Sequence, residues 1–217
     1  MKRLIFIVEG QTEEEFVNQV LAPYFLKFGI HSVSAIKIAT SSASKGGFVN
    51  YEHLKNDILK RIRETNILVT TFVDYFRMPT NMPEYGKSQS EVEIDNKISS
   101  LEKAIEEDIR FPNFIPYIQK YEFEALLFSS NVGFENLYNS EIYTQTAKVI
   151  DDYQNPENIN SRPEHAPSKR LITIMNGYEK VFEGNMIALE LGIDIILEKC
   201  PRFKAWVEKL IVRASAA

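Results

Sequence analysis

The chain has 217 residues and a formal net charge of −5, with 44% hydrophobic and 25% charged residues. This composition predicts a folded protein with a sizeable core, and the acidic balance excludes a protein that binds nucleic acid through bulk positive charge. The single cysteine, Cys200, excludes an internal disulfide and a cysteine-based zinc cluster. With a single cysteine, the predicted compartment is a reducing cytoplasm. No apolar run approaches the roughly 18 residues of a spanning helix, so no membrane segment is predicted.

Strands and helices are predicted to alternate through the first half of the chain. Apolar, β-branched or alternating runs predict strands at residues 3–8, 32–39, 67–74 and 113–121. Apolar residues spaced by three and four predict helices at residues 16–25, 51–64, 91–108 and in FEALLF from Phe123. This order predicts an α/β fold with a largely parallel sheet and right-handed crossovers.

Two prolines and the second half of the chain qualify this pattern. Pro23 should kink or end the first helix, and Pro116 pushes the fourth strand towards the sheet edge or a late start. Residues 135–151 and 168–212 are predicted to be helical, with a polar loop between them. We expect residues 1–130 to form the α/β core and residues 131–217 a helical extension that packs on it.

Acidic residues follow three of the predicted strands. Glu9 follows the first strand, Asp74 ends the third, and Glu122 and Glu124 come after the fourth. Ligands of open α/β sheets gather outside the carboxyl ends of the strands, so these side chains could share one site. Their mutual repulsion would be costly without a cation, and oxygen ligands without His or Cys favour Mg²⁺ or Mn²⁺ over zinc.

Each acidic residue also has a structural interpretation. Thr12 and Glu15 match a capping box, with Glu14 facing water in the first helical turn. Asp74 could be the polar end of a strand, and the glutamates of YEFEALLF could be solvated. Capping does not explain Glu9, because an unpaired carboxylate directly after a buried strand is expensive.

Basic residues occur at two further places. In APSKRL, Ser168 is the predicted helix N-cap, and Lys169 and Arg170 fall in a first turn, where the helix dipole disfavours cations. That conflict is typical of a site that faces phosphate, although two ordinary surface cations explain it equally well. The glycine-rich segment 45–47 is either a contact to phosphate or a plain loop.

Four segments in this order resemble the TOPRIM superfamily, and more closely a prokaryotic family catalogued as domain of unknown function 4276. They are EGQTE after the first strand, VDYFRMP after the third, then YEFEALLF and APSKRL. The resemblance runs from residue 3 to about residue 175. It implies a four-stranded, mainly parallel sheet between helices, a Mg²⁺ site, and phosphodiester chemistry like that of topoisomerases, primases and overcoming-lysogenization-defect nucleases.

The resemblance also implies roles for single residues. Glu9 matches the first glutamate, a metal ligand or general acid–base, and Glu13 matches the second glutamate of the nuclease-like branch. Asp74 matches the first aspartate of the D-x-D motif. Phe76 stands where that motif has its second aspartate, which argues against a full two-metal site, although Glu122 and Glu124 could supply the missing carboxylates.

Two functions follow as hypotheses. The first is a Mg²⁺- or Mn²⁺-dependent nuclease, acting on DNA rather than RNA in phage defence or a mobile element, with Lys169 or Arg170 offsetting charge on the phosphate. The second is a non-catalytic interaction module that acts with an ATPase on a separate chain. Nothing in the sequence determines an oligomeric state.

Overall fold

The computed structural model describes residues 1–39, 48–159 and 163–216. At its centre lies a sheet in the order β2–β1–β3–β4, with a fifth strand, β5, that pairs with β3 further along. All pairings are parallel, which confirms the predicted α/β fold class. The strands are β1 (Arg3–Val8), β2 (Val33–Lys37), β3 (Ile67–Asp74), β4 (Phe114–Ile115) and β5 (Ile118–Gln119).

The predicted fourth strand is divided in two. Pro116 has no N–H to give to the ladder, so β4 ends at Ile115 and β5 begins at Ile118. The hydroxyl of Thr71 fills the gap, because its oxygen accepts the N–H of Tyr117 and donates to the Tyr117 carbonyl, both at 2.8 Å. The edge of β3 therefore stays paired across the proline.

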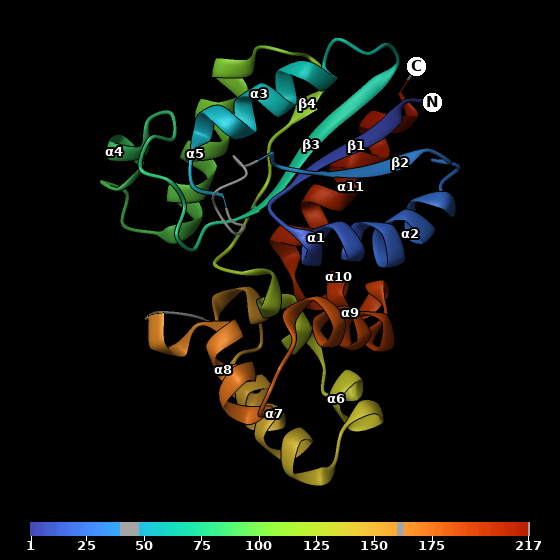
Figure 1. The fold of residues 1–217 in the computed structure, drawn as a ribbon, viewed down its shortest axis with the longest axis vertical. Coiled ribbons are helices and arrows are strands. Elements are labelled where there is room, and N and C mark those ends of the chain that lie inside the picture. The colour runs from blue at the N-terminus through green and yellow to red at the C-terminus, as the bar shows by residue number, and fades with distance from the viewer. Residues whose placement is uncertain (40–47, 160–162, 217) are drawn as a thin grey trace.

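Helices surround the sheet and extend below the carboxyl ends of its strands (Figure 1). Those of the first 130 residues are α1 (Gln11–Phe16), the π-helix η1 (Val17–Leu21), α2 (Ala22–Leu26), α3 (Tyr51–Arg61), α4 (Tyr85–Ser88), α5 (Ile94–Ile109) and the 3₁₀-helix η2 (Phe123–Ser129). The rest are α6 (Val132–Leu137), α7 (Ser140–Asp152), the 3₁₀-helices η3 (Pro156–Asn158) and η4 (Pro163–His165), α8 (Pro167–Ile174), α9 (Lys180–Leu191), α10 (Ile193–Lys199) and α11 (Pro201–Ser215). None of the described helices is both long and apolar enough to span a membrane.

Of the two predicted effects of Pro23, a kink or an end of the first helix, the structure excludes the end. The segment continues through η1 into α2 as far as Leu26, and Gly29 follows it with a φ of 78°. Proline removes one N–H from a helix and crowds the preceding turn. The wider π turn directly before Pro23, in which the Ala22 N–H donates to the Val17 carbonyl, accommodates the proline without a break.

Strand side chains alternate between two cores, one on each face of the sheet. On one face, Ile5 and Val69 pack with residues of α3 and α5, such as Leu54 and Leu101. On the other face, Phe6 and its neighbours pack against α1, η1, α2 and the helices of the second half of the chain. Both faces are therefore covered, which explains why β1 and β3 consist mainly of apolar and β-branched residues.

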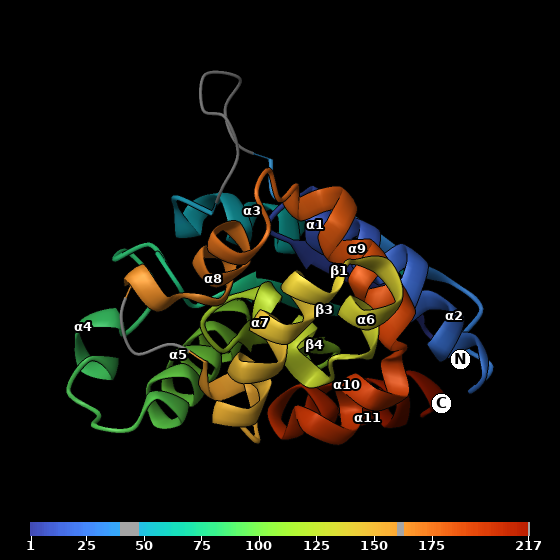
Figure 2. The same ribbon diagram turned by 90° about the horizontal axis from the view of Figure 1, so that it is seen from below.

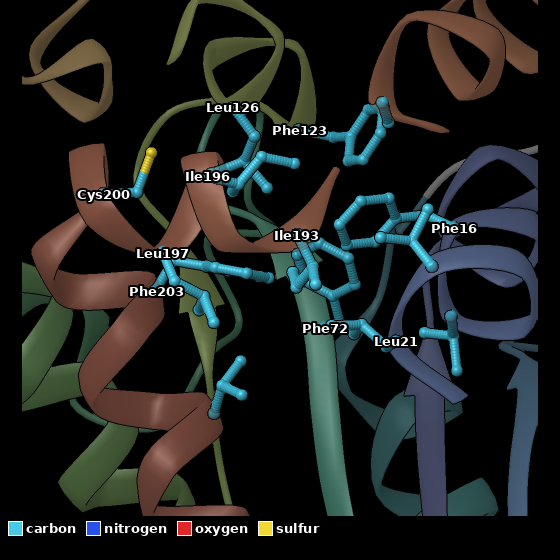
Figure 3. Packing of buried hydrophobic residues seen from close by; sticks show 14 of the residues in the cluster. Phe16, Leu21, Phe72, Phe123, Leu126, Ile193, Ile196, Leu197, Cys200 and Phe203 are labelled. Atoms are coloured by element: carbon cyan, nitrogen blue, oxygen red, sulfur yellow. The ribbon is translucent and has the colours of Figure 1, made fainter. Parts of the chain in front are cut away.

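Aromatic side chains connect the late helices to the sheet. Phe72 of β3 lies among Phe16, Phe123 and Phe203, with ring centroids 6.0 to 6.3 Å away (Figure 3). Trp206 of α11 also packs there, and its indole N–H donates to the buried Thr70 hydroxyl at 2.9 Å. This packing holds η2 against the carboxyl end of β3. The first turn of η2, which contains Glu124, is held there with it.

Candidate metal centre

Four carboxylates gather at the carboxyl ends of the two central strands. Glu9 directly follows β1, Asp74 is the last residue of β3, and these strands are neighbours in the sheet. Glu13 lies in α1 and Glu124 in the first turn of η2. Glu13, Asp74 and Glu124 are all buried, the last completely. The parallel sheet therefore assembles residues that lie 115 positions apart in the chain.

The turn after β1 holds its two glutamates through the backbone. The Oε1 atom of Glu9 accepts the N–H of Phe48 at 3.3 Å, and its Oε2 atom accepts the N–H of Asp74 at 3.4 Å. The Oε2 atom of Glu13 accepts the N–H of Gly10, the N-cap of α1, at 2.9 Å. One oxygen of Glu13 thus serves the helix end while the other remains available.

The predicted capping box of Thr12 and Glu15 is wrong. Helix α1 begins at Gln11, so its third residue is Glu13, which makes the capping contact. Glu15 instead accepts a hydrogen bond from Gln19 at 2.8 Å. Glu14 does not simply face water, because it forms an ion pair with Lys37 at 2.6 Å.

The ammonium group of Lys180 lies at the point where three of the carboxylates converge. Its Nζ atom is 3.7 Å from Glu13 Oε1, 3.9 Å from Asp74 Oδ2 and 3.4 Å from Glu124 Oε1. The lysine is the first residue of α9, which packs beside α1, as the view from below also shows (Figure 2). Although burial opposes its charge, the carboxylates, Glu124 foremost, hold the pKa of Lys180 well above its ordinary value.

Burial and mutual repulsion make Glu9, Asp74 and Glu124 hard to ionise. Desolvation raises the pKa of Glu124 to about 7, even with the attraction of Lys180. Desolvation likewise raises the pKa of Asp74 well above its ordinary value, and Glu13 and Glu9 add to that effect. The pKa of Glu9 is raised by burial and by Glu13. One ammonium group therefore compensates four carboxylates only in part.

The chemistry of the cluster fits a divalent cation. Its donors are carboxylate oxygens, which Mg²⁺ and Mn²⁺ prefer. Asp74 Oδ1 and both oxygens of Glu124 are buried and have no hydrogen-bond partner among the described residues, a costly condition that a cation would relieve. As they stand, no three His, Cys, Asp or Glu side chains of the described segments are arranged to hold a metal ion. Lys180 is the cation at their centre instead.

Glu122 has a different partner from the other predicted ligands. Its Oε2 atom accepts the N–H of Ser168 and its Oε1 atom accepts the Ser168 hydroxyl, both at 3.0 Å. Ser168 is therefore not the N-cap, because α8 begins at Pro167 after the N-cap Ala166. The carboxylate of Glu122 instead supplies the acceptor that the first turn of α8 needs.

The predicted phosphate contacts are not paired with this cluster in the described residues. Lys169 is exposed on α8. The guanidinium group of Arg170 lies over the ring of Tyr153 and donates to the His165 carbonyl at 2.9 Å. Neither cation forms an ion pair with the carboxylates in the described part of the chain. Segment 45–47 lies outside the described residues.

Sequence reasoning missed Lys180, although a usable signal was present. A lysine at the first position of a helix is unfavourable for the helix dipole, the same conflict that drew attention to Lys169. Because residues 168–212 were predicted as one helical region, the start of a new helix at Lys180 was not recognised. Tyr178 lies two residues before Lys180, and its buried hydroxyl has no hydrogen-bond partner among the described residues. Desolvation is the main cause that raises the pKa of Tyr178, and the charge of Glu124 adds to it.

The match to known families agrees with these motifs. A family profile, described as a domain of unknown function and labelled DUF4276, matches residues 8–211. The chain belongs to the DUF4276 family. The resemblance inferred from the four sequence segments is thereby confirmed. No curated protein matches this DUF4276 chain in sequence.

Solved structures similar to this DUF4276 protein include C-terminal regions of two OLD proteins. The region from Burkholderia pseudomallei is 15% identical, with a TM-score of 0.48 over 99% of this chain and 97% of that one. The region from Xanthomonas campestris pv. campestris, phased with iodine, is 15% identical, with a TM-score of 0.46 over 99% of this chain and 94% of that one.

Proposed function

We propose that the protein is a metal-dependent nuclease whose site is the carboxylate cluster around Lys180. The observation that carries this proposal is the convergence of Glu13, Asp74 and Glu124 on one ammonium group, with three buried carboxylate oxygens that lack a hydrogen-bond partner among the described residues. Such a cluster is unfavourable for folding unless a cation is bound. Perturbed carboxylates gathered at strand ends are typical of functional sites.

In this proposal Glu9, Glu13, Asp74 and Glu124 hold Mg²⁺ or Mn²⁺. A bound divalent cation orients a phosphodiester and offsets the charge that develops on it during hydrolysis. Glu9 also keeps β1 and β3 in register at the site, since it accepts the N–H of Asp74. Lys180 adds a second positive charge for the phosphate. Glu122 positions α8 through Ser168, and Lys169 is left to contact the nucleic acid further from the reacting phosphate.

A cleavage assay with paired variants tests the proposal. Plasmid DNA, single-stranded DNA and RNA are incubated with Mg²⁺, Mn²⁺ or EDTA. The Glu13→Gln and Asp74→Asn variants are expected to lose about 100-fold or more in rate. Glu14→Gln is the matched control, because Glu14 is the neighbour of Glu13 in α1 and pairs with Lys37. Equal cleavage by Glu13→Gln, Glu14→Gln and wild type refutes the assignment.

A second candidate is an interaction module that acts with a separate ATPase chain. Phe76 favours it, because an apolar ring occupies the position of the second acidic residue of the D-x-D motif and packs under the Arg77 guanidinium at 5.2 Å. Calorimetry separates the two functions. The module predicts no Mn²⁺ binding at millimolar metal and a stable complex with an ATPase, whereas the nuclease predicts Mn²⁺ binding that depends on Asp74.

A further inference from the structure

Lys180 occupies the space that a metal ion bound to these carboxylates would need. Its Nζ atom lies 3.4 to 3.9 Å from oxygens of Glu13, Asp74 and Glu124. Divalent cations bind oxygens at about 2.0–2.6 Å. The same three carboxylates therefore cannot close on a metal ion while the ammonium group stays between them, because two cations so close repel strongly.

The position of Lys180 in the fold is compatible with movement. Lys180 is the first residue of α9, so a shift of its backbone would disturb the segment before the helix and not the helix itself. Its side chain is 41% exposed. The carboxylates, in contrast, are nearly inaccessible, with side-chain exposures of 4% for Glu13, 9% for Asp74 and 0% for Glu124. The helix dipole of α9 adds nothing to hold a cation at its first position. Lys180 is thus the most exposed of the four side chains that meet here.

We propose that Lys180 is a built-in counter-ion that holds the cluster together without metal and is displaced when a divalent cation binds. This inference rests on the proposed metal site and adds its regulation. In the metal-free protein the lysine limits repulsion among the carboxylates. On metal binding it leaves the centre and becomes available to an anionic substrate at the rim. Metal affinity is accordingly set by competition between the two cations.

The wild-type protein allows a direct test that does not use activity. An amine-reactive acetylating reagent is applied with and without saturating Mn²⁺, and each lysine is followed by mass spectrometry. Displacement predicts that Lys180 is labelled about tenfold faster or more with Mn²⁺, because its ammonium group leaves the carboxylates that protect it. Lys169 is the internal control, since it is exposed and should be labelled equally in both conditions.

Metal binding to variants gives the reciprocal test. By calorimetry, Lys180→Met should bind Mn²⁺ at least about tenfold more tightly than wild type, because no competing cation remains. Lys169→Met should bind like wild type. If Lys180→Met is unstable without metal, its thermal unfolding is followed as Mn²⁺ is added, and a larger metal-dependent stabilisation than in wild type supports the proposal.

The outcomes separate this inference from the proposed function. Equal Mn²⁺ affinity in wild type and Lys180→Met, or unchanged labelling of Lys180, overturns the displacement while leaving the metal site intact. Binding by Lys180→Met alone shows that the lysine excludes the metal from the wild-type site, which overturns both the displacement and the metal-dependent function. An absence of Mn²⁺ binding in both proteins overturns the metal site and the displacement together.

Discussion

Replacement of Glu124 by glutamine should stabilise the metal-free protein at neutral and alkaline pH. The Glu124 side chain is completely buried, and neither of its oxygens has a hydrogen-bond partner among the described residues. Desolvation raises its pKa from 4.5 to about 7, a value that already includes the attraction of Lys180. The folded protein therefore favours the neutral acid, which glutamine imitates.

The sign and size of the effect follow from that pKa. Because the folded value lies above the unfolded one, the neutral form gives its full stability below about pH 4.5, and this stability is lost as the pH rises through about 7. At about 1.4 kcal/mol per pH unit, the ionised carboxylate costs about 3 kcal/mol above this range. The advantage of Glu124→Gln should thus be small near pH 5 and reach about 3 kcal/mol near pH 8.

Urea unfolding in EDTA, followed by circular dichroism at these two pH values, measures the difference. Glu106→Gln on the exposed face of α5 is the control and should change stability little at either pH. With excess Mn²⁺, the unfolding free energy of wild type should rise, and that of Glu124→Gln should rise much less. The difference in stability between the two proteins should therefore shrink or change sign. If Glu124→Gln is no more stable than wild type at pH 8 without metal, ionised Glu124 does not destabilise the metal-free protein and the reasoning is refuted.

Three further predictions concern the packing that supports the site. Gly133→Ala should cost about 1–3 kcal/mol in unfolding free energy, because the added Cβ would lie 2.9 Å from the Ile187 carbonyl oxygen of α9. Gly86→Ala, with nothing within 4 Å, should be neutral or stabilising in the same urea titration. Thr70→Val should cost about 1–3 kcal/mol by leaving the buried Trp206 indole N–H unpaired, whereas Thr70→Ser should cost less because it keeps the acceptor. Glu157→Gln should lower the unfolding free energy by about 1–2 kcal/mol. The two oxygens of Glu157 accept the Arg202 and Phe203 N–H groups at the start of α11, and an amide keeps only one acceptor oxygen. An unchanged urea midpoint would show that water replaces the lost acceptor.

Local patterns were sufficient for the sheet and for most acidic residues. The strands at residues 3–8 and 67–74 were predicted with the bounds that the structure has, because strands buried on both faces are rich in apolar and β-branched residues. Their carboxyl ends meet at one edge of a parallel sheet, so Glu9 and Asp74 could be placed together without coordinates. Boundaries that depend on one hydrogen bond were less predictable, as Glu13 in place of Glu15 at the cap of α1 shows.

Compensation between distant groups was not visible in the sequence. The continuation of the helix past Pro23 was not predicted, because the π turn before it is a response of the whole segment to packing and not a local preference. Glu122 and Glu124 were both predicted to reach the metal site, and only the approach of α8 assigned the oxygens of Glu122 to Ser168. Arg170 was expected near phosphate, and the ring of Tyr153 from α7's C-terminal end took it elsewhere.

The sequence by itself determined that carboxylates meet at the end of a parallel sheet, because strand periodicity and chain order are local properties. Only the tertiary structure decided which cation stands among them. Lys180 lies 56 residues after Glu124 and 171 after Glu9, and it reaches them because α9 packs against α1 and η2. Contacts at such separation depend on how the helices dock on the sheet, and docking is set by the shape of the shared core rather than by any segment alone.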